Sequence, residues 1–278
     1  MKQIEWLNTQ LRPRAYRAAL FDFDGTISLI REGWQPIMYG YFTEVLSDVS
    51  PDEPKEQIEV LVRDFVDRLT GKQTIYQCIY LAEEIQRRGG RAEAPIVYKQ
   101  EYNKRLLEHI EHRVDALKSG AADRDEFLIP GSIELLESLR ERGLVLYLAS
   151  GTDHEYVVDE AAALGITSYF NGGIYGALDD YENFSKEQVI RDLVLPEIAA
   201  GDALLGFGDG YVEIENVKAV GGVAVGVASN EKEREGIDQW KRERLIQAGA
   251  DVIIGDFRCQ ELLLENLFGG KEDGVSSF

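Results

Sequence analysis

The most constraining feature of the chain is the stretch from Ala18 to Thr26, in which the apolar run Ala18-Ala19-Leu20-Phe21 leads into Asp22-Phe23-Asp24-Gly25-Thr26. An apolar run followed by a glycine predicts a buried β-strand that ends in a turn. Alternation along a strand places Asp22 and Asp24 on one face and turns Phe23 towards the core. Two carboxylates on one face can act as nucleophile and proton donor, or as metal ligands, and this stretch leaves both roles open.

Composition excludes several classes of partner. The chain has 278 residues, of which 44% are hydrophobic, and a formal net charge of −20. Such a charge repels nucleic acid and anionic lipid, so we expect neither a nucleic-acid nor a membrane partner. The sequence shows neither a signal peptide nor an apolar run long enough to span a membrane, which predicts a cytoplasmic protein. Cys78 and Cys259 lack the spacing of a metal site and are expected to be buried thiols. Nothing in the sequence indicates an oligomeric state.

Hydrophobic periodicity divides the chain into two domains. Apolar residues at Ile4, Leu7 and Leu11 predict a short amphipathic helix before the first strand. Residues 29–128 form the first predicted domain, an all-helical insert. Its four helical stretches cover residues 35–46, 56–69, 75–88 and 96–117. The second domain is an α/β core formed by residues 1–28 and 129–278.

The core alternates apolar runs with helical stretches. Strands are predicted at residues 144–149, 203–207, 223–227 and 251–254, with a further short strand near residues 169–175. Helices are predicted at residues 133–142, 155–164, 185–193, 212–219 and 260–268. Strands that alternate with helices indicate an open, parallel, Rossmann-like sheet with right-handed crossovers.

Polar signals follow the ends of the predicted strands. Ser150-Gly151-Thr152 follows the strand at 144–149, and Asp209, with Glu213 close behind it, follows the strand at 203–207. Side chains at the carboxyl ends of parallel strands converge on one crevice, so these groups should meet Asp22 and Asp24 there.

The chemistry of this set indicates a phosphoryl site. The carboxylates of Asp22, Asp209 and Glu213 would repel one another without a cation, and such oxygen ligands suit magnesium. Lys186, the Ser150 hydroxyl and the backbone N–H groups that follow the strand, at Gly151, would donate hydrogen bonds to an anion. A carboxylate nucleophile can form an acyl-phosphate, and a second carboxyl can carry protons to the leaving oxygen and from water.

The ordered motifs resemble those of the haloacid dehalogenase superfamily. Asp22-Phe23-Asp24-Gly25-Thr26, Ser150, Lys186 and Gly208-Asp209-Gly210 with Glu213 match its four motifs in order. The resemblance implies that Asp22 is the nucleophile, Asp24 the general acid and base, and Ser150, Gly151 and Lys186 the phosphoryl ligands. It also implies that Asp22, Asp209 and the backbone carbonyl of Asp24 are magnesium ligands. Glu213 departs from the family, many of whose members carry Asp there, and its longer side chain could hold a metal-bound water.

The resemblance further implies that the helical insert is a C1 cap of the phosphoglycolate phosphatase or β-phosphoglucomutase type. The expected activity is that of a magnesium-dependent phosphatase acting on a small phosphorylated metabolite. A phosphomutase is the nearest alternative, and a phospho-signalling receiver or an inactive phospho-ligand binding module are the others. In the cap, Lys72 is a candidate contact for the leaving group.

Three further predictions concern the surroundings of the motifs. Thr152 and Asp153 are expected to cap the helix that follows them. The charged run at residues 231–244 is expected to be an exposed surface segment.

Overall fold

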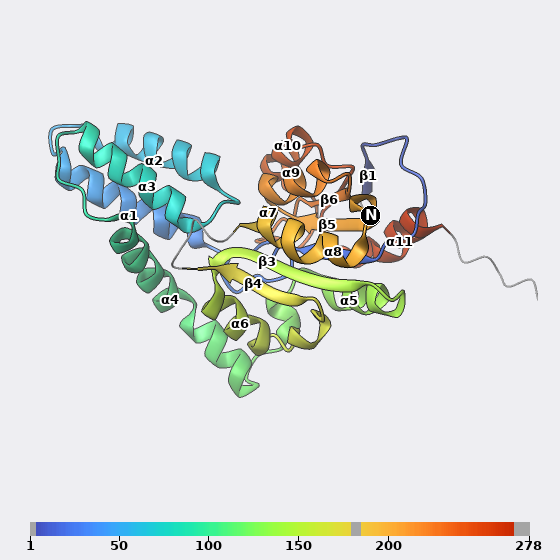
Figure 1. The fold of residues 1–278 in the computed structure, drawn as a ribbon. Helices are drawn as coiled ribbons and strands as arrows, with labels where there is room; N and C mark the ends of the chain where they lie inside the picture. The colour runs from blue at the N-terminus through green and yellow to red at the C-terminus, as the bar shows by residue number, and fades with distance from the viewer. Residues whose placement is uncertain (1–3, 179–184, 270–278) are drawn as a thin grey trace, which may run out of the picture.

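The computed structural model describes residues 4–178 and 185–269. These residues form a seven-stranded sheet with the strand order β1-β7-β6-β5-β2-β3-β4 (Figure 1). The strands are β1 (Ile4–Trp6), β2 (Ala18–Phe21), β3 (Val145–Asp153), β4 (Gly173–Ala177), β5 (Leu204–Gly208), β6 (Val223–Val227) and β7 (Val252–Ile254). All neighbouring pairs are parallel except β1 and β7. The predicted open, mostly parallel α/β fold is therefore confirmed.

Alternating side chains of β2 enter two separate apolar layers. Ala19 and Phe21 pack in the layer that contains helices α5 and α6, whereas Ala18 and Leu20 pack in the layer that contains α9 and α10. The helices of the first layer are α5 (Ser132–Glu141), α6 (His154–Ala163) and α11 (Gln260–Phe268). Those of the second are α7 (Lys186–Val189), the π-helical turn η4 (Ile190–Val194), α8 (Leu195–Ile198), α9 (Tyr211–Ala219) and α10 (Gln239–Gln247). Helices on both faces bury β2 completely, which explains its uninterrupted apolar run.

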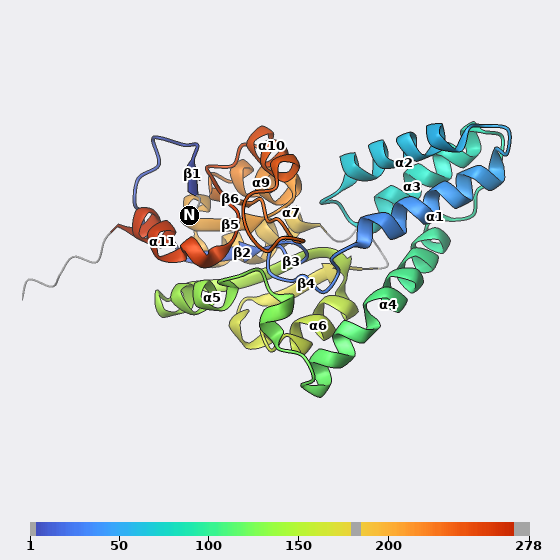
Figure 2. The ribbon, with the colours of Figure 1, turned by 180° about the vertical axis from the view of Figure 1, so that it is seen from behind.

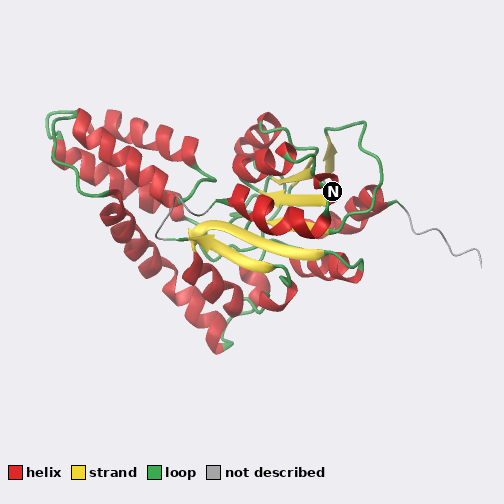
Figure 3. Ribbon diagram, viewed as in Figure 1, coloured by secondary structure: helices red, strands yellow, loops and turns green. Residues whose placement is uncertain are grey.

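The insert after β2 is all-helical, as predicted. It contains α1 (Trp34–Val49), α2 (Lys55–Leu69), α3 (Thr74–Arg87) and α4 (Pro95–Ser119). Phe42 of α1 and Phe65 of α2 stack with ring centroids 5.9 Å apart in the centre of this bundle. Figures 1 and 3 show α1 to α3 as a bundle beside the core, while α4 runs from the bundle to α6. This arrangement is that of a C1 cap.

Ion pairs attach α4 to the core. Lys99 of α4 pairs with Asp153, and Lys118, near the end of α4, pairs with Asp159 of α6 at 2.7 Å. The guanidinium of Arg113 donates to the carbonyls of Ile30 and Glu32, in the segment that enters the cap, at 2.7 and 2.9 Å. The view from behind shows α4 and α6 side by side (Figure 2). The long cap helix is therefore fixed to the core near both of its ends.

Two sequence predictions about local structure are wrong. Residues 4–11 do not form a helix, because Ile4–Trp6 pairs antiparallel with Val252–Ile254 at the edge of the sheet. The strand predicted to end at Ala149 continues to Asp153 after a register shift, so Ser150 lies within β3 and not behind it. Of the short strand predicted near residues 169–175, the part at 173–175 is confirmed as the start of β4, whereas Thr167–Tyr169 is a 3-10 turn.

The cap boundaries at residues 29 and 128 stay predictions. No helix in residues 4–178 or 185–269 combines the length and apolar character that crossing a membrane requires.

Candidate functional site

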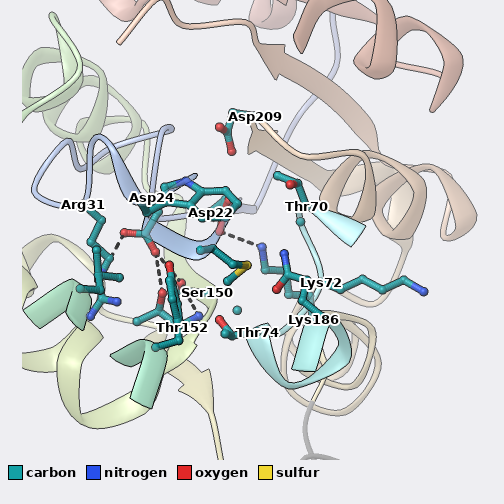
Figure 4. Close-up of a pocket in the computed structure, with 17 residues that line it drawn as sticks. Asp22, Asp24, Arg31, Thr70, Lys72, Thr74, Ser150, Thr152, Lys186 and Asp209 are labelled. Atoms are coloured by element: carbon teal, nitrogen blue, oxygen red, sulfur yellow. Dashed lines mark hydrogen bonds and ion pairs between the residues drawn. The ribbon is translucent and has the colours of Figure 1, made fainter. Parts of the chain in front are cut away.

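The carboxyl ends of β2, β3 and β5 meet at one cavity. Phe21, the last residue of β2, is in register with Leu148 of β3 and Phe207 of β5, so the residues that follow them reach the same edge of the sheet. The cavity has a volume of about 100 Å³. Its lining includes six residues singled out from the core sequence, namely Asp22, Asp24, Ser150, Gly151, Lys186 and Asp209 (Figure 4).

Asp22 is held by a buried lysine. The Nζ of Lys186 donates to Oδ1 of Asp22 at 2.7 Å, and both side chains are at most 9% exposed. Burial raises the pKa of Asp22 to about 6, against the opposing effect of Lys186. The carboxylate of Glu213, on α9, also contacts Lys186. Lys186 therefore lies between two carboxylates at the floor of the cavity, and the metal-ligand role predicted for Glu213 stays a prediction.

Asp24 points away from Asp22 towards β3 and the segment that enters the cap. Its Oδ2 accepts hydrogen bonds from the hydroxyls of Thr152 at 2.8 Å and Ser150 at 3.3 Å. The Nε of Arg31 lies 3.9 Å from its Oδ1. Burial raises the pKa of Asp24 to about 6, while Arg31 opposes the shift. The two aspartates thus have different partners, which is the arrangement expected when one attacks and the other transfers protons.

Arg31 is a buried side chain whose partner was not found from the sequence. Its Nε and Nη2 donate to the carboxylate of Glu160, on α6, at 2.6 to 3.1 Å. The guanidinium also lies over the ring of Tyr156, 5.5 Å from the centroid. The pKa of Arg31 is raised by Glu160 and Asp24 despite its burial, so the side chain stays charged.

Asp209 is positioned by the turn after the first motif and by a second buried lysine. Its backbone N–H donates to Oγ1 of Thr26 at 2.9 Å, and its Oδ2 lies 2.8 Å from Nζ of Lys241. A Cβ at Gly25 would stand 2.3 Å from Asp209 Oδ2, and φ at Gly25 is +72°, so this turn requires glycine. Lys241 also pairs with Glu231 at 2.6 Å.

The donor set fits the predicted magnesium ion. Asp22 and Asp209 are close enough for the charge of Asp209 to raise the pKa of Asp22, and a cation between them would relieve that repulsion. Within the described ranges, no three or more His, Cys, Asp or Glu side chains are gathered as a metal cage. Magnesium retains several waters and commonly takes only one or two carboxylates, so a pair supplemented by a backbone carbonyl suffices.

The cap forms the opposite wall of the cavity. That wall is contributed by Arg31, Trp34, Met38, Thr70, Gly71, Lys72, Thr74, Gln77, Tyr102 and Leu106. Lys72, predicted to approach the leaving group, lines the cavity through its backbone and stem. Its ammonium extends away from the carboxylates and lies 5.7 Å from the ring centroid of Tyr76 (Figure 4).

Three expectations about neighbouring residues need correction. Thr152 does not cap α6, because its hydroxyl bonds to Asp24, and Asp153 makes no capping bond because its carboxylate pairs with Lys99 and Asn103. The run at residues 231–244 is not wholly exposed, since Lys241 is 7% exposed and pairs with Asp209, which lines the cavity. Lys241 and Glu160 lie on helices, where a charged residue gives no sequence signal of burial, so only their ion-pair partners in the structure identify them as buried.

Comparison with known proteins places the chain in a family. A family model described as haloacid dehalogenase-like hydrolase matches residues 16–221. No curated protein matches the sequence.

Solved structures share the fold at low identity. A structure titled as a predicted phosphoglycolate phosphatase from Haemophilus somnus has 17% identity and a TM-score of 0.57, covering 89% of this chain and 97% of its own. A β-phosphoglucomutase from Clostridium difficile has 16% identity and a TM-score of 0.58, with coverage of 90% and 96%. A protein like phosphonoacetaldehyde hydrolase from Oleispira antarctica has 14% identity and a TM-score of 0.58, with coverage of 92% and 94%.

Identities this low demonstrate the fold and leave the substrate open. The family match, in contrast, covers more than half of the chain, including β2 and the aspartates that follow it. The chain belongs to the haloacid dehalogenase-like hydrolases.

Proposed function

We propose that the protein is a magnesium-dependent phosphatase that hydrolyses a small phosphorylated metabolite through an aspartyl-phosphate. The observation that carries this proposal is the pair of differently held aspartates, with Asp22 bonded to Lys186 and Asp24 bonded to Thr152. The likeness to structures titled as phosphatases adds support.

In the first step, a carboxylate oxygen of Asp22 attacks phosphorus and the bond to the leaving oxygen breaks. Asp24 donates its proton to that oxygen, and the alcohol departs. A carboxyl whose pKa is about 6 can both hold and release a proton near neutral pH. In the second step, Asp24 takes a proton from water as the water oxygen attacks phosphorus, the bond to Asp22 breaks, and inorganic phosphate leaves with Asp22 restored.

Lys186 and the backbone around Gly151 would hold the phosphoryl oxygens, with the Ser150 hydroxyl as a third donor. Asp22, Asp209 and the backbone carbonyl of Asp24 would hold magnesium, which when bound neutralises charge on the phosphoryl group. The cap excludes water from the cavity while the first step proceeds.

The test is phosphate release from acetyl phosphate and from small alkyl phosphates in the presence of magnesium. We expect Asp22→Asn to lower the rate with alkyl phosphates by at least about 1,000-fold, and Asp24→Asn by about 100-fold or more. Asp24→Asn should also accumulate phosphoenzyme from acetyl phosphate, because acetate leaves without a proton while the second step lacks its base. The control is Asp159→Asn, an aspartate on α6 whose side chain is 51% exposed.

An unchanged rate in Asp22→Asn would overturn the mechanism. A phosphomutase would use the same side chains and return the phosphoryl group to a second oxygen. Isomerisation of a sugar monophosphate without phosphate release would therefore replace the phosphatase proposal with that alternative.

A further inference from the structure

The cap wall of the cavity offers uncharged hydrogen-bonding groups. Tyr102 of α4 and Gln77 of α3 both line the cavity, and each residue is 3% exposed. In the described part of the chain, neither side chain has a hydrogen-bond partner, although both are polar. Neither polar group is sealed from solvent, so each can form a hydrogen bond with a ligand that enters the cavity.

The cations at the site are already matched by carboxylates. Lys186 contacts Asp22 and Glu213, and Lys241 contacts Asp209 and Glu231.

Arg31, the third buried cation, is paired with Glu160 and has Asp24 at 3.9 Å. Each of the three cations therefore faces two carboxylates, and bound magnesium would still leave carboxylates in excess. The Lys72 ammonium extends away from the carboxylates. A carboxylate on the substrate's leaving group would enter a region with no cation to spare.

The cavity also limits the size of the substrate. Its volume of about 100 Å³ has to hold the phosphoryl group as well. Sites for drug-sized ligands occupy roughly 300–1,000 Å³. Apolar contact from Trp34, Met38 and Leu106 suits a short carbon skeleton.

We infer that the leaving group is a small uncharged polyol, whose free hydroxyl bonds to Tyr102 and Gln77. This inference rests on the proposed phosphatase activity and names its substrate class. A phosphorylated acid such as phosphoglycolate is disfavoured by the same arrangement, even though structural neighbours are titled as phosphoglycolate phosphatases.

The decisive comparison uses two substrates that differ only at the end of the leaving group. 2-Hydroxyethyl phosphate carries a hydroxymethyl group where phosphoglycolate carries a carboxylate. We expect kcat/KM to favour 2-hydroxyethyl phosphate by about 10-fold or more, since an unpaired buried charge costs at least that factor. Glycerol 3-phosphate and 3-phosphoglycerate form a second pair with the same expected order.

Variants test the two recognition groups. Tyr102→Phe should lower kcat/KM for 2-hydroxyethyl phosphate by about 2- to 10-fold, mainly through KM, because it removes one hydrogen bond. The control is Tyr98→Phe, one turn earlier on α4, where the hydroxyl accepts from the Glu93 N–H at 2.9 Å and does not line the cavity. Gln77→Lys should shift the ratio of the two substrates towards phosphoglycolate by about 10-fold, because it adds a positive charge to the cavity wall that faces the leaving group.

The inference would be overturned if the natural protein turned over phosphoglycolate as fast as 2-hydroxyethyl phosphate, or faster. It would also fail if Gln77→Lys left the ratio of kcat/KM for the two substrates unaltered, or if Tyr102→Phe lowered kcat/KM no more than Tyr98→Phe does. These failures leave phosphatase activity intact. Absence of phosphate release from every substrate, acetyl phosphate included, would instead refute the proposed function and the inference with it.

Discussion

The ion pair between Arg31 and Glu160 should contribute strongly to stability, and Glu160→Gln tests this. Three hydrogen bonds of 2.6 to 3.1 Å join the two side chains, which are 8% and 3% exposed. The substitution keeps the shape of the side chain and removes its charge, so Arg31 remains buried without its main counterion. Breaking a buried pair in this way costs about 3–5 kcal/mol. Asp24, at 3.9 Å from Arg31, compensates part of the loss, so we expect a decrease of about 3 kcal/mol in the free energy of unfolding.

Urea denaturation at pH 7, with linear extrapolation, measures this decrease. The matched control is Asp159→Asn at the preceding position of α6, where an exposed pair with Lys118 should contribute less than about 1 kcal/mol. The double variant Arg31→Met/Glu160→Met removes both charges and should recover most of the loss. A decrease below about 1 kcal/mol for Glu160→Gln, or a double variant as unstable as the sum of its single variants, would refute this reasoning.

Three further predictions concern the cap and its contact with the core. The guanidinium of Arg244, on α10, donates to the carbonyl of Thr70 at 3.2 Å, so Arg244→Met should speed amide hydrogen exchange in residues 70–74 while α4 exchange is unchanged. A hydrogen bond from Arg88 lowers the pKa of Glu53, so this pair stabilises the fold above the unfolded pKa, and the benefit is lost as pH falls through the lower folded pKa. Thermal unfolding should therefore show Glu53→Gln less stable at pH 7, by less than about 1 kcal/mol, with the difference vanishing in acid. Burial raises the pKa of Cys78 to about 12, so iodoacetamide at pH 8 should modify this thiol only after unfolding, as peptide mapping would detect.

The sheet was predictable because its strands are buried on both faces. Residues 223–227 form an unbroken apolar run, and β6 has these same bounds. The failure at residues 4–11 has the opposite cause. Ile4–Trp6 is a short edge strand whose structure depends on pairing with Val252–Ile254, and no local pattern encodes that pairing.

The candidate site likewise contains residues that the sequence predicts and residues that it does not. Asp22 and Asp209 follow buried strands, and the topology of the sheet brings them together. The order of strands and helices along the sequence was enough to predict that they meet. Glu160 and Lys241 lie on helices whose sequences read as solvated surface. Their burial follows from a counterion on another segment, Arg31 in one case and Asp209 in the other.

The aspartates were predictable and their buried partners were not, because the two are positioned in different ways. The backbone of a strand end fixes where an aspartate begins, but a buried carboxylate also needs a partner to offset the cost of leaving water. Asp24 and Asp209 have cationic neighbours in Arg31 and Lys241, which come from the segment that enters the cap and from α10. Because the segment that carries Arg31 is also tied to Glu160 of α6, the position of the cap and the electrostatic environment of Asp24 are set by one set of contacts. A change in either partner should therefore alter the placement of the cap and the chemistry of the cavity together.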